Sequence, residues 1–262
     1  MSTAMPFDED LTRRIVEVYT TPDVVAQRDA TLEILDLQPG ERVLDIGSGP
    51  GFLAAGIASR VGESGAVSGI DLSEPMIAHA SGLEAAPGAA QITFALGDAT
   101  ALGFSDQSFD AVVSTQVYEY VEEIERALDE AHRVLRPGGR LAVLDTDWGS
   151  IVWRSPNPER TARVLAVWDE HLADPWLPRQ LGGLMRAAGF TLDHTEAIPL
   201  LNTGFAEQTY SANLIGFVER FVSGQEGIDQ DEVAAWAAGQ RSMGDDYFFS
   251  LNRYLFTATR PG

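Results

Sequence analysis

An acidic, glycine-rich turn follows directly after a short apolar segment in the first fifth of the chain. Residues 41–46 (ERVLDI) have the character of a strand, and the turn that ends it is Asp45-Ile46-Gly47-Ser48-Gly49-Pro50-Gly51. Glycine adopts dihedral angles that other residues avoid and lets a ligand approach the backbone closely. In open parallel sheets, ligands bind at the carboxyl ends of the strands. The turn therefore predicts a site for a nucleotide-like ligand.

Strand-like and helix-like patterns alternate along the first 150 residues. The further strand-like segments are residues 66–71, 91–96, 109–115 and 140–145. Stretches with apolar residues at helical spacing separate them, and a helix at 22–36 is expected before the first strand. Strands joined by helices imply a parallel sheet with both faces covered. We expect an α/β fold.

The second half of the chain contains more helices than a minimal sheet of this kind needs. The expected helices and strands are 157–173, 178–189, 206–223 and 230–240, and 191–198 and 248–259. The helices at 157–173 and 206–223 are the additional ones. We expect one domain, residues 1–262, in which residues 151–178 and 203–245 form a helical cap or lid over the site.

Charge and composition narrow the class of ligand. The formal net charge is −21, and all 18 basic residues are arginine. Such a surface repels phosphate backbones and anionic membranes at long range, so neither nucleic acid nor a membrane is the expected partner. A small molecule is expected instead, and a cationic or neutral one is accommodated more easily. The pattern does not indicate an oligomeric state.

Thiol and metal chemistry find little support in the sequence. The chain has no cysteine, which excludes disulfides and thiolate catalysis. Its four histidines show no spacing typical of zinc ligands, so we expect no metal site, although a carboxylate-bound Mg²⁺ remains open. No apolar run approaches the roughly 18–20 residues that cross a bilayer. The first ten residues, MSTAMPFDED, lack a hydrophobic signal core, and we expect a cytoplasmic protein.

The residues of the turn favour one kind of cofactor. A dinucleotide site has the pattern G-x-G-x-x-G, but the third glycine position counted from Gly47 is Phe52. Asp45 would repel a pyrophosphate and attract an ammonium or sulfonium group. S-adenosylmethionine carries both cations and no phosphate. A nicotinamide-dependent oxidoreductase is the alternative that Asp45 and Phe52 count against.

Two more acids follow the next strands. Asp71 ends the segment Gly69-Ile70-Asp71-Leu72-Ser73, where a carboxylate accepts hydrogen bonds from ribose hydroxyls. Asp98, before Ala99, follows the third strand and is placed to accept from an adenine amino group. Leu72 and Met76 are expected to cover the faces of the ring.

Four segments together resemble the class I S-adenosylmethionine-dependent methyltransferases, and most closely the branch of ubiquinone/menaquinone-biosynthesis enzymes. The segments are VLDIGSGPG (43–51), GIDLS (69–73), GDATALGF with SFDAVVS (97–104 and 108–114) and HRVLRPGGRLAVLD (132–145). The resemblance covers residues 20–150 strongly and residues 178–198 and 248–260 more loosely. It implies a Rossmann-like, seven-stranded, mostly parallel sheet whose last strand is antiparallel.

The resemblance also implies roles for single residues. S-adenosylmethionine is the implied cofactor, with its methionine portion on the glycine turn, its ribose on Asp71 and its adenine near Asp98. The stretch Thr115-Gln116-Val117-Tyr118 corresponds to the segment that faces the transferred methyl group. The expected cofactor-binding residues are Arg28, Asp45, Gly47, Ser48, Gly49, Asp71, Leu72, Met76, Asp98, Ala99 and Gln116.

Arg28 is predicted to bind the cofactor's carboxylate. It interrupts the apolar stripe of its helix, and a charge that faces the core needs a partner. The fork of an arginine matches a carboxylate. An ordinary ion pair with an acid of the protein, or a stem that carries its head out to water, are the alternatives.

Three residues are candidates for catalysis. Glu119 is a candidate base or a holder of a cationic acceptor, unless it is a solvated acid in the first turn of the next helix. Tyr118 either lines the methyl pocket or packs in the core. His171, on an expected lid helix with Val164 and Trp168, either deprotonates a hydroxyl or is structural.

The sequence therefore predicts a small-molecule methyltransferase, with transfer to oxygen ahead of transfer to nitrogen or carbon. Methyl transfer is an in-line displacement that depends mainly on holding nucleophile and methyl group in line, so a strict catalytic residue is not required. A protein that binds S-adenosylmethionine without transferring its methyl group is a further alternative. The motifs do not identify the acceptor.

Overall fold

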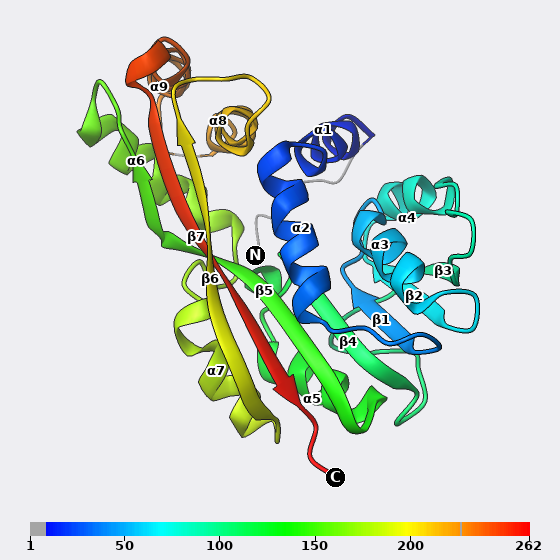
Figure 1. Ribbon diagram of the computed structural model, residues 1–262. Helices are drawn as coiled ribbons and strands as arrows, with labels where there is room; N and C mark the ends of the chain where they lie inside the picture. Colours follow the sequence, from blue (N-terminus) through cyan, green and yellow to red (C-terminus); the bar gives the residue numbers. More distant parts are fainter. Residues whose placement is uncertain (1–8, 226) are drawn as a thin grey trace.

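The computed structural model describes residues 9–225 and 227–262, and within them seven strands form one sheet (Figure 1). Residues 1–8, which make up most of the acidic N-terminal segment, lie outside the described residues. Within the described ranges, no helix is both long and apolar enough to cross a membrane.

The strand order across the sheet is β3-β2-β1-β4-β5-β7-β6. The strands are β1 (Arg42–Ile46), β2 (Ala66–Asp71), β3 (Gln91–Leu96), β4 (Phe109–Thr115), β5 (Leu135–Trp153), β6 (Thr191–Thr203) and β7 (Phe248–Thr259). The first five run parallel, and β7 lies antiparallel between β5 and β6. The predicted sheet, with its last strand antiparallel, is confirmed. The order reverses between β1 and β4, which is where ligands bind in such sheets.

Helices cover both faces of the sheet because side chains along each strand alternate between two cores. Leu44 and Ile46 of β1 face the helices α5 (Ile124–Val134) and α7 (Pro178–Ala187). Val43, which directly precedes Leu44 and therefore points to the opposite face, packs on α2 (Pro22–Ile34) and α3 (Phe52–Val61). Helix α4 (Glu74–Ser81) packs on β2 and β3, and α1 (Glu9–Tyr19) precedes α2. The site predicted from the glycine turn therefore lies at the carboxyl ends of the central strands, in a sheet that helices cover on both faces.

Three further helices pack on the extended ends of β5, β7 and β6 (Figure 1). They are α6 (Pro158–Trp168), α8 (Tyr210–Val222) and α9 (Gln230–Arg241). Aromatic rings form much of their core: the ring centroid of Trp153 lies 5.3 Å from that of Trp236 and 4.9 Å from that of Phe249. We refer to these three helices as the cap helices; that they act as a lid remains a prediction.

The expected strands are too short at the cap end. Strand β5 begins at Leu135 and runs to Trp153, beyond the expected 140–145, because it continues to pair with β7 past a register shift between Asp147 and Val152. The sequence at that shift is polar and contains glycine, so it lacks the apolar pattern from which a strand is predicted. Strand β6 likewise extends to Thr203.

The expected helix at 157–173 ends early. Helix α6 stops at Trp168, and residues Asp169–His171 form a short 3-10 turn. The Nδ1 atom of His171 contacts the backbone carbonyl of Trp168, which is the acceptor that a continued helix would use for the amide of Leu172. The amide of Leu172 bonds to the carbonyl of Asp169 instead (3.2 Å).

Candidate functional site

The glycine turn links β1 to α3 through three residues with positive φ. Gly47, Gly49 and Gly51 have φ values of 68°, 49° and 85°. A Cβ atom on Gly47 would lie 2.1 Å from a methyl group of Val117, and one on Gly51 would lie 2.9 Å from atoms of Ala80 and Phe94. A Cβ atom on Gly49 would meet no atom within 4 Å. Packing therefore requires the first and third glycines, whereas the middle one borders open space.

Asp71, at the end of β2, holds this turn in place. Its Oδ2 atom accepts a hydrogen bond of 2.9 Å from the amide of Gly49, and its Oδ1 atom accepts one of 2.9 Å from the amide of Ser73. Burial raises the pKa of Asp71, while these two backbone amides lower it. The acid that the sequence assigns to the ribose is thus already attached to the loop that would carry the cofactor.

Asp45, in β1, carries a buried carboxyl group that is not paired with any cation. The residue is 1% exposed, and among the described residues no side chain pairs with either of its carboxyl oxygens; the nearest donor is the backbone of Ala54, whose contact lies outside hydrogen-bond geometry. Burial, followed by the charge of Asp71, raises the pKa of Asp45 to about 8. A cation placed beside Asp45 would restore its ionised form.

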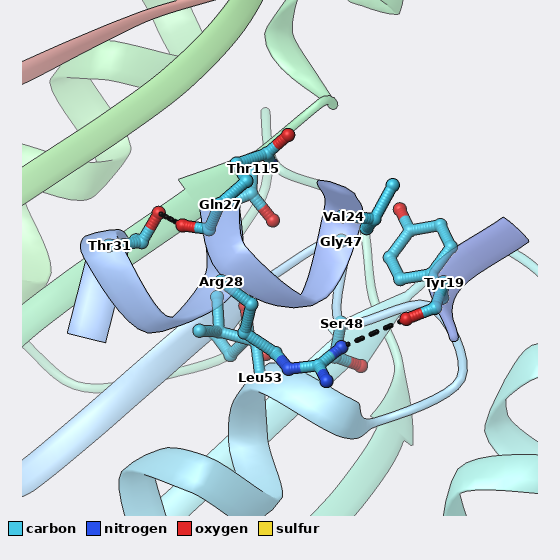
Figure 2. A pocket seen from close by; sticks show the side chains of 10 residues that line it. Tyr19, Val24, Gln27, Arg28, Thr31, Gly47, Ser48, Leu53 and Thr115 are labelled. Atoms are coloured by element: carbon cyan, nitrogen blue, oxygen red, sulfur yellow. Dashed lines mark hydrogen bonds between the residues drawn. The ribbon is translucent and has the colours of Figure 1, made fainter. Parts of the chain in front are cut away.

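Asp45 lines a pocket beside α2, and Figure 2 labels the other residues that line it. The pocket is lined by Tyr19, Val24, Gln27, Arg28, Thr31, Asp45, Gly47, Ser48, Leu53 and Thr115. Of the predicted cofactor-binding residues, the pocket brings together Arg28, Asp45, Gly47 and Ser48.

Arg28 extends from α2 over the glycine turn. Its Nη1 atom donates to the backbone carbonyl of Tyr19 (3.1 Å; Figure 2). Its guanidinium lies 5.5 Å from the ring centroid of Phe52. Among the residues that the structure describes, no carboxylate forms an ion pair with Arg28, so the predicted alternative of an ordinary ion pair is not observed. Burial lowers the pKa of Arg28. One pocket therefore offers a guanidinium and a carboxyl group, each without a partner of opposite charge in the described chain.

The residues assigned to adenine lie outside this pocket. Leu72 is 75% exposed, while Met76 and Ala99 are buried. Asp98 accepts hydrogen bonds of 2.8 Å from both the amide and the hydroxyl of Thr100. Leu96, which sequence reasoning missed, is 54% exposed at the end of β3. Two exposed leucines, Leu72 and Leu96, near Asp98 offer apolar surface for a planar ring such as adenine. Met76 is part of the buried core and does not offer such a surface.

Gln116 follows β4 in a left-handed conformation, with φ of 59°. Its amide donates to the carbonyl of Leu144 (2.7 Å), and its Oε1 atom accepts from the hydroxyl of Thr146 (2.6 Å). Non-glycine residues rarely adopt this conformation, and they do so mainly where the surroundings fix it. The segment that sequence reasoning places against the methyl group is thus held rigidly to β5.

Glu119 and Asp145 each accept a hydrogen bond from a backbone amide close to the other acid in the sequence. The Oε2 atom of Glu119 accepts from the amide of Thr146, and the Oδ1 atom of Asp145 accepts from the amide of Val117, both at 3.0 Å. Burial raises the pKa of Glu119 to about 7 and also raises the pKa of Asp145, to which the charge of Glu119 adds. Glu119 is 1% exposed, so the alternative of a solvated acid is wrong.

Tyr118 packs in the core on the side of α5, fully buried, and its hydroxyl has no hydrogen-bond partner in the described structure.

His171 is 3% exposed and stacks on Trp168, with ring centroids 3.8 Å apart. Burial lowers the pKa of His171 to about 4, so the ring is neutral near pH 7. The ring of Tyr120, which is 45% exposed, lies edge-on 5.7 Å from it. Both catalytic assignments, of Tyr118 and of His171, remain predictions.

Several pocket residues were missed by sequence reasoning. Gln27 shares a helical face with Val24 and Thr31, so a polar side chain on the apolar face of α2 was the available signal. Tyr19 lies in α1, which was not predicted. Arg253 interrupts the apolar pattern of β7, is 4% exposed and donates to Gln27.

Comparisons with known proteins agree with this geometry. The family model described as a methyltransferase domain matches residues 44–143. The chain is 41% identical over 119 residues to a ubiquinone/menaquinone biosynthesis C-methyltransferase of Dinoroseobacter shibae, covering 45% of this chain and 47% of that protein. It is 39% identical over 123 residues to an arsenite methyltransferase of Halobacterium salinarum, covering 47% of this chain and 30% of that protein. The chain thus spans about half, or less, of these relatives' lengths.

Solved structures are similar over most of the chain. Among them is that of the [4+2]-cyclase SpnF, with 26% identity and a TM-score of 0.57, and the match covers 91% of this chain and 81% of that one. The similarity to the two methyltransferases is confined to about half of the chain, whereas this structural match also includes most of the remainder.

Proposed function

Because this chain belongs to the class I S-adenosylmethionine-dependent methyltransferases, we propose that it transfers the cofactor's methyl group to an oxygen, nitrogen or carbon atom of a small molecule. The membership and the cofactor were both expected from the four sequence motifs, and the comparisons confirm them. The acceptor, the atom that is methylated and the roles of individual residues are proposals. A cytoplasmic location stays a prediction from the sequence.

The pairing of Asp45 with Arg28 in one pocket carries the proposal. A buried carboxyl group and a guanidinium, both without a counter-charge among the described residues, complement the ammonium and carboxylate of an amino acid. S-adenosylmethionine has that end and supplies, when bound, a methyl group on a positively charged sulfur. A dinucleotide has no such zwitterionic end, and its pyrophosphate would meet the acidic groups of Asp45 and Asp71.

The remaining groups support the same orientation. The open side of Gly49 would admit the ligand to the backbone, and Asp71 would accept from the ribose while it holds Gly49. Leu72, together with Leu96, would cover the adenine beside Asp98. The opposite end of the ligand would then face Gln116 and the residues after β4. These residues would orient the acceptor and exclude water from it.

The relatives suggest different acceptors, and the composition discriminates between them. A soft ion such as arsenic(III) prefers thiolate ligands, and this chain contains no cysteine. Arsenite is therefore a poor candidate. A small organic acceptor, bound between the cofactor and the cap helices, agrees better with the aromatic residues there, and oxygen remains the preferred atom.

A second candidate function rests on the match to a [4+2]-cyclase. A protein of this fold would then use the bound cofactor to shape a pocket for another reaction, without transferring the methyl group. The intact glycine turn and Asp71 agree with either function. The measurement that separates them is whether S-adenosylhomocysteine forms as the acceptor is consumed.

Isothermal titration with S-adenosylmethionine, S-adenosylhomocysteine and NAD tests the proposed function. We expect the first two to bind and NAD not to bind. Asp71→Ala should lose at least tenfold in affinity, whereas Glu63→Ala, which removes the same charge from an exposed loop, should not. Binding of NAD in place of the adenosyl compounds would reject the proposal.

A further inference from the structure

Arg253 is a buried cation in an otherwise acidic protein. Of the arginines that the structure describes, only Arg253 is buried, at 4% exposure. It lies on β7, paired with Thr146 of β5 and Ile198 of β6. A buried guanidinium is costly unless a counter-charge accompanies it.

The partners of Arg253 are neutral. Its Nε atom donates to the hydroxyl of Thr146 (3.2 Å), its Nη1 atom donates to the Oε1 atom of Gln27, and its guanidinium lies 4.6 Å from the ring centroid of Tyr210. Within the described residues it forms no ion pair. A guanidinium has five N–H groups, so these bonds leave donors for a further acceptor.

The acids nearest to Arg253 do not supply a full negative charge. Glu119 and Asp145 both feel the charge of Arg253, but burial raises the pKa of each, that of Glu119 to about 7. Their oxygens are also engaged by backbone amides of Thr146 and Val117. Among the described residues, Arg253 therefore has neutral hydrogen-bond partners and an aromatic ring beside it, but no carboxylate paired with it.

Hydrogen bonds link Arg253 to the lining of the cofactor pocket and to the segment after β4. Gln27 lines the pocket and accepts from Arg253, and Thr146 connects Arg253 to Gln116 after β4. Aromatic side chains also lie close to Arg253: Tyr210 lies under the guanidinium, and Tyr19 lines the pocket near it. Charge and aromatic surface thus meet where an acceptor would lie.

We propose that Arg253 forms the anion-recognising end of the acceptor site, and that the acceptor is an aromatic compound with an anionic oxygen, a carboxylate or a phenolate. This inference rests on the proposed function, since it places the acceptor beside the bound cofactor. It departs from the expectation of a cationic or neutral acceptor. The surface charge acts on approach at long range, whereas a desolvated guanidinium acts on contact.

The test measures binding of small probes to protein saturated with S-adenosylhomocysteine. Benzoate and 4-nitrophenolate are the anionic probes, and benzamide is the neutral match to benzoate. We expect the wild-type protein to bind an anionic probe at least tenfold more tightly than benzamide. Arg253→Gln should abolish that preference and leave the affinity for S-adenosylhomocysteine within about threefold. Arg154→Gln, an exposed arginine paired with Asp246, should change neither.

Each outcome decides a separate point. Equal binding of anions and benzamide by the wild-type protein, or no binding of either anion, overturns the inference while leaving the cofactor proposal intact. Failure of S-adenosylhomocysteine to bind overturns the proposed function instead. Preference for benzoate supports a carboxylate, and preference for 4-nitrophenolate supports a phenolate. If Arg253→Gln does not fold, the preference of the wild-type protein for an anionic probe over benzamide still tests the inference. Arg253→Lys, which keeps the charge but loses the planar fork, should then weaken that preference.

Discussion

The carboxylate of Glu119 accepts a hydrogen bond of 3.0 Å from the backbone amide of Thr146, while Asp145, the residue before Thr146, accepts one of 3.0 Å from the amide of Val117. Two buried acids thus fasten the end of β4 to the middle of β5 in a reciprocal way. Gln116, the residue directly before Val117, has an unusual φ of 59°. We therefore predict that Glu119 positions this segment and does not need to move a proton.

Replacing Glu119 by glutamine should therefore leave most of the activity. The amide oxygen of Glu119→Gln still accepts from Thr146, so we expect kcat to fall by no more than about threefold, whereas Glu119→Ala leaves a buried amide unpaired and costs ~1–3 kcal/mol of stability. Steady-state kinetics and thermal unfolding of both variants check this. A loss of ~10²-fold or more in kcat for Glu119→Gln would instead identify a general base.

Substitutions at two glycines of the turn should affect different properties, one the stability of the fold and the other the affinity for the cofactor. Gly47→Ala places a Cβ atom 2.1 Å from Val117 at a positive φ and should cost about 2–4 kcal/mol of stability. Gly49→Ala meets no protein atom within 4 Å, so it should cost only about 1 kcal/mol but lower cofactor affinity at least tenfold. Chemical denaturation and titration calorimetry test the pair. Normal cofactor binding by Gly49→Ala would show that the open side of the turn is not where the ligand lies.

Asp45 should destabilise the free protein as the pH rises. Its folded-state pKa of about 8 is above the ordinary value of 3.8, so the free energy of unfolding falls between about pH 4 and pH 8 as the buried group is forced to ionise. Asp45→Asn removes this penalty. We expect its melting temperature to exceed that of the wild type by on the order of 5 °C at pH 8, and by less at pH 5. A difference that does not change with pH would contradict the assignment.

Binding of the cofactor should release a proton near pH 7. In the free protein Asp45 is mostly protonated at that pH, and an ammonium or sulfonium group beside it favours the ionised form. Calorimetry in buffers of different ionisation enthalpy should therefore detect the release of close to one proton per S-adenosylmethionine bound. Asp45→Asn should release none, with Glu63→Gln as the control that behaves like the wild type.

The sequence predicted the cofactor half of the molecule better than the cap. Alternating strands and helices, the glycine turn and the acids at the ends of β1 and β2 follow local rules, and each was placed correctly along the chain. Arg28 was singled out because a charge stands out on an apolar helical face. The structure places Arg28 and Asp45 in the same pocket, and their roles toward the cofactor stay predictions.

Other parts depend on contacts that no local pattern encodes. The extension of β5 to Trp153 is stabilised by β7, which lies about a hundred residues further along the chain. The end of α6 at Trp168 depends on the side chain of His171, and the setting of Arg253 depends on Gln27 from the other end of the sequence. A single sequence shows the polar residue in each case but not the partner that gives it a role.

Strands β6 and β7 pair in an antiparallel ladder from the central sheet up to the cap helices, and β5 accompanies them past one register shift. A domain that swings as a rigid body needs a flexible joint, and a ladder of backbone hydrogen bonds is a stiff connection. We therefore expect the acceptor of the proposed reaction to enter by local displacement of helices and loops, not by hinged opening of the whole upper part. We also expect that exchanging α6, α8 and α9 with those of a relative, while keeping these strands, would change the acceptor preference without loosening the sheet.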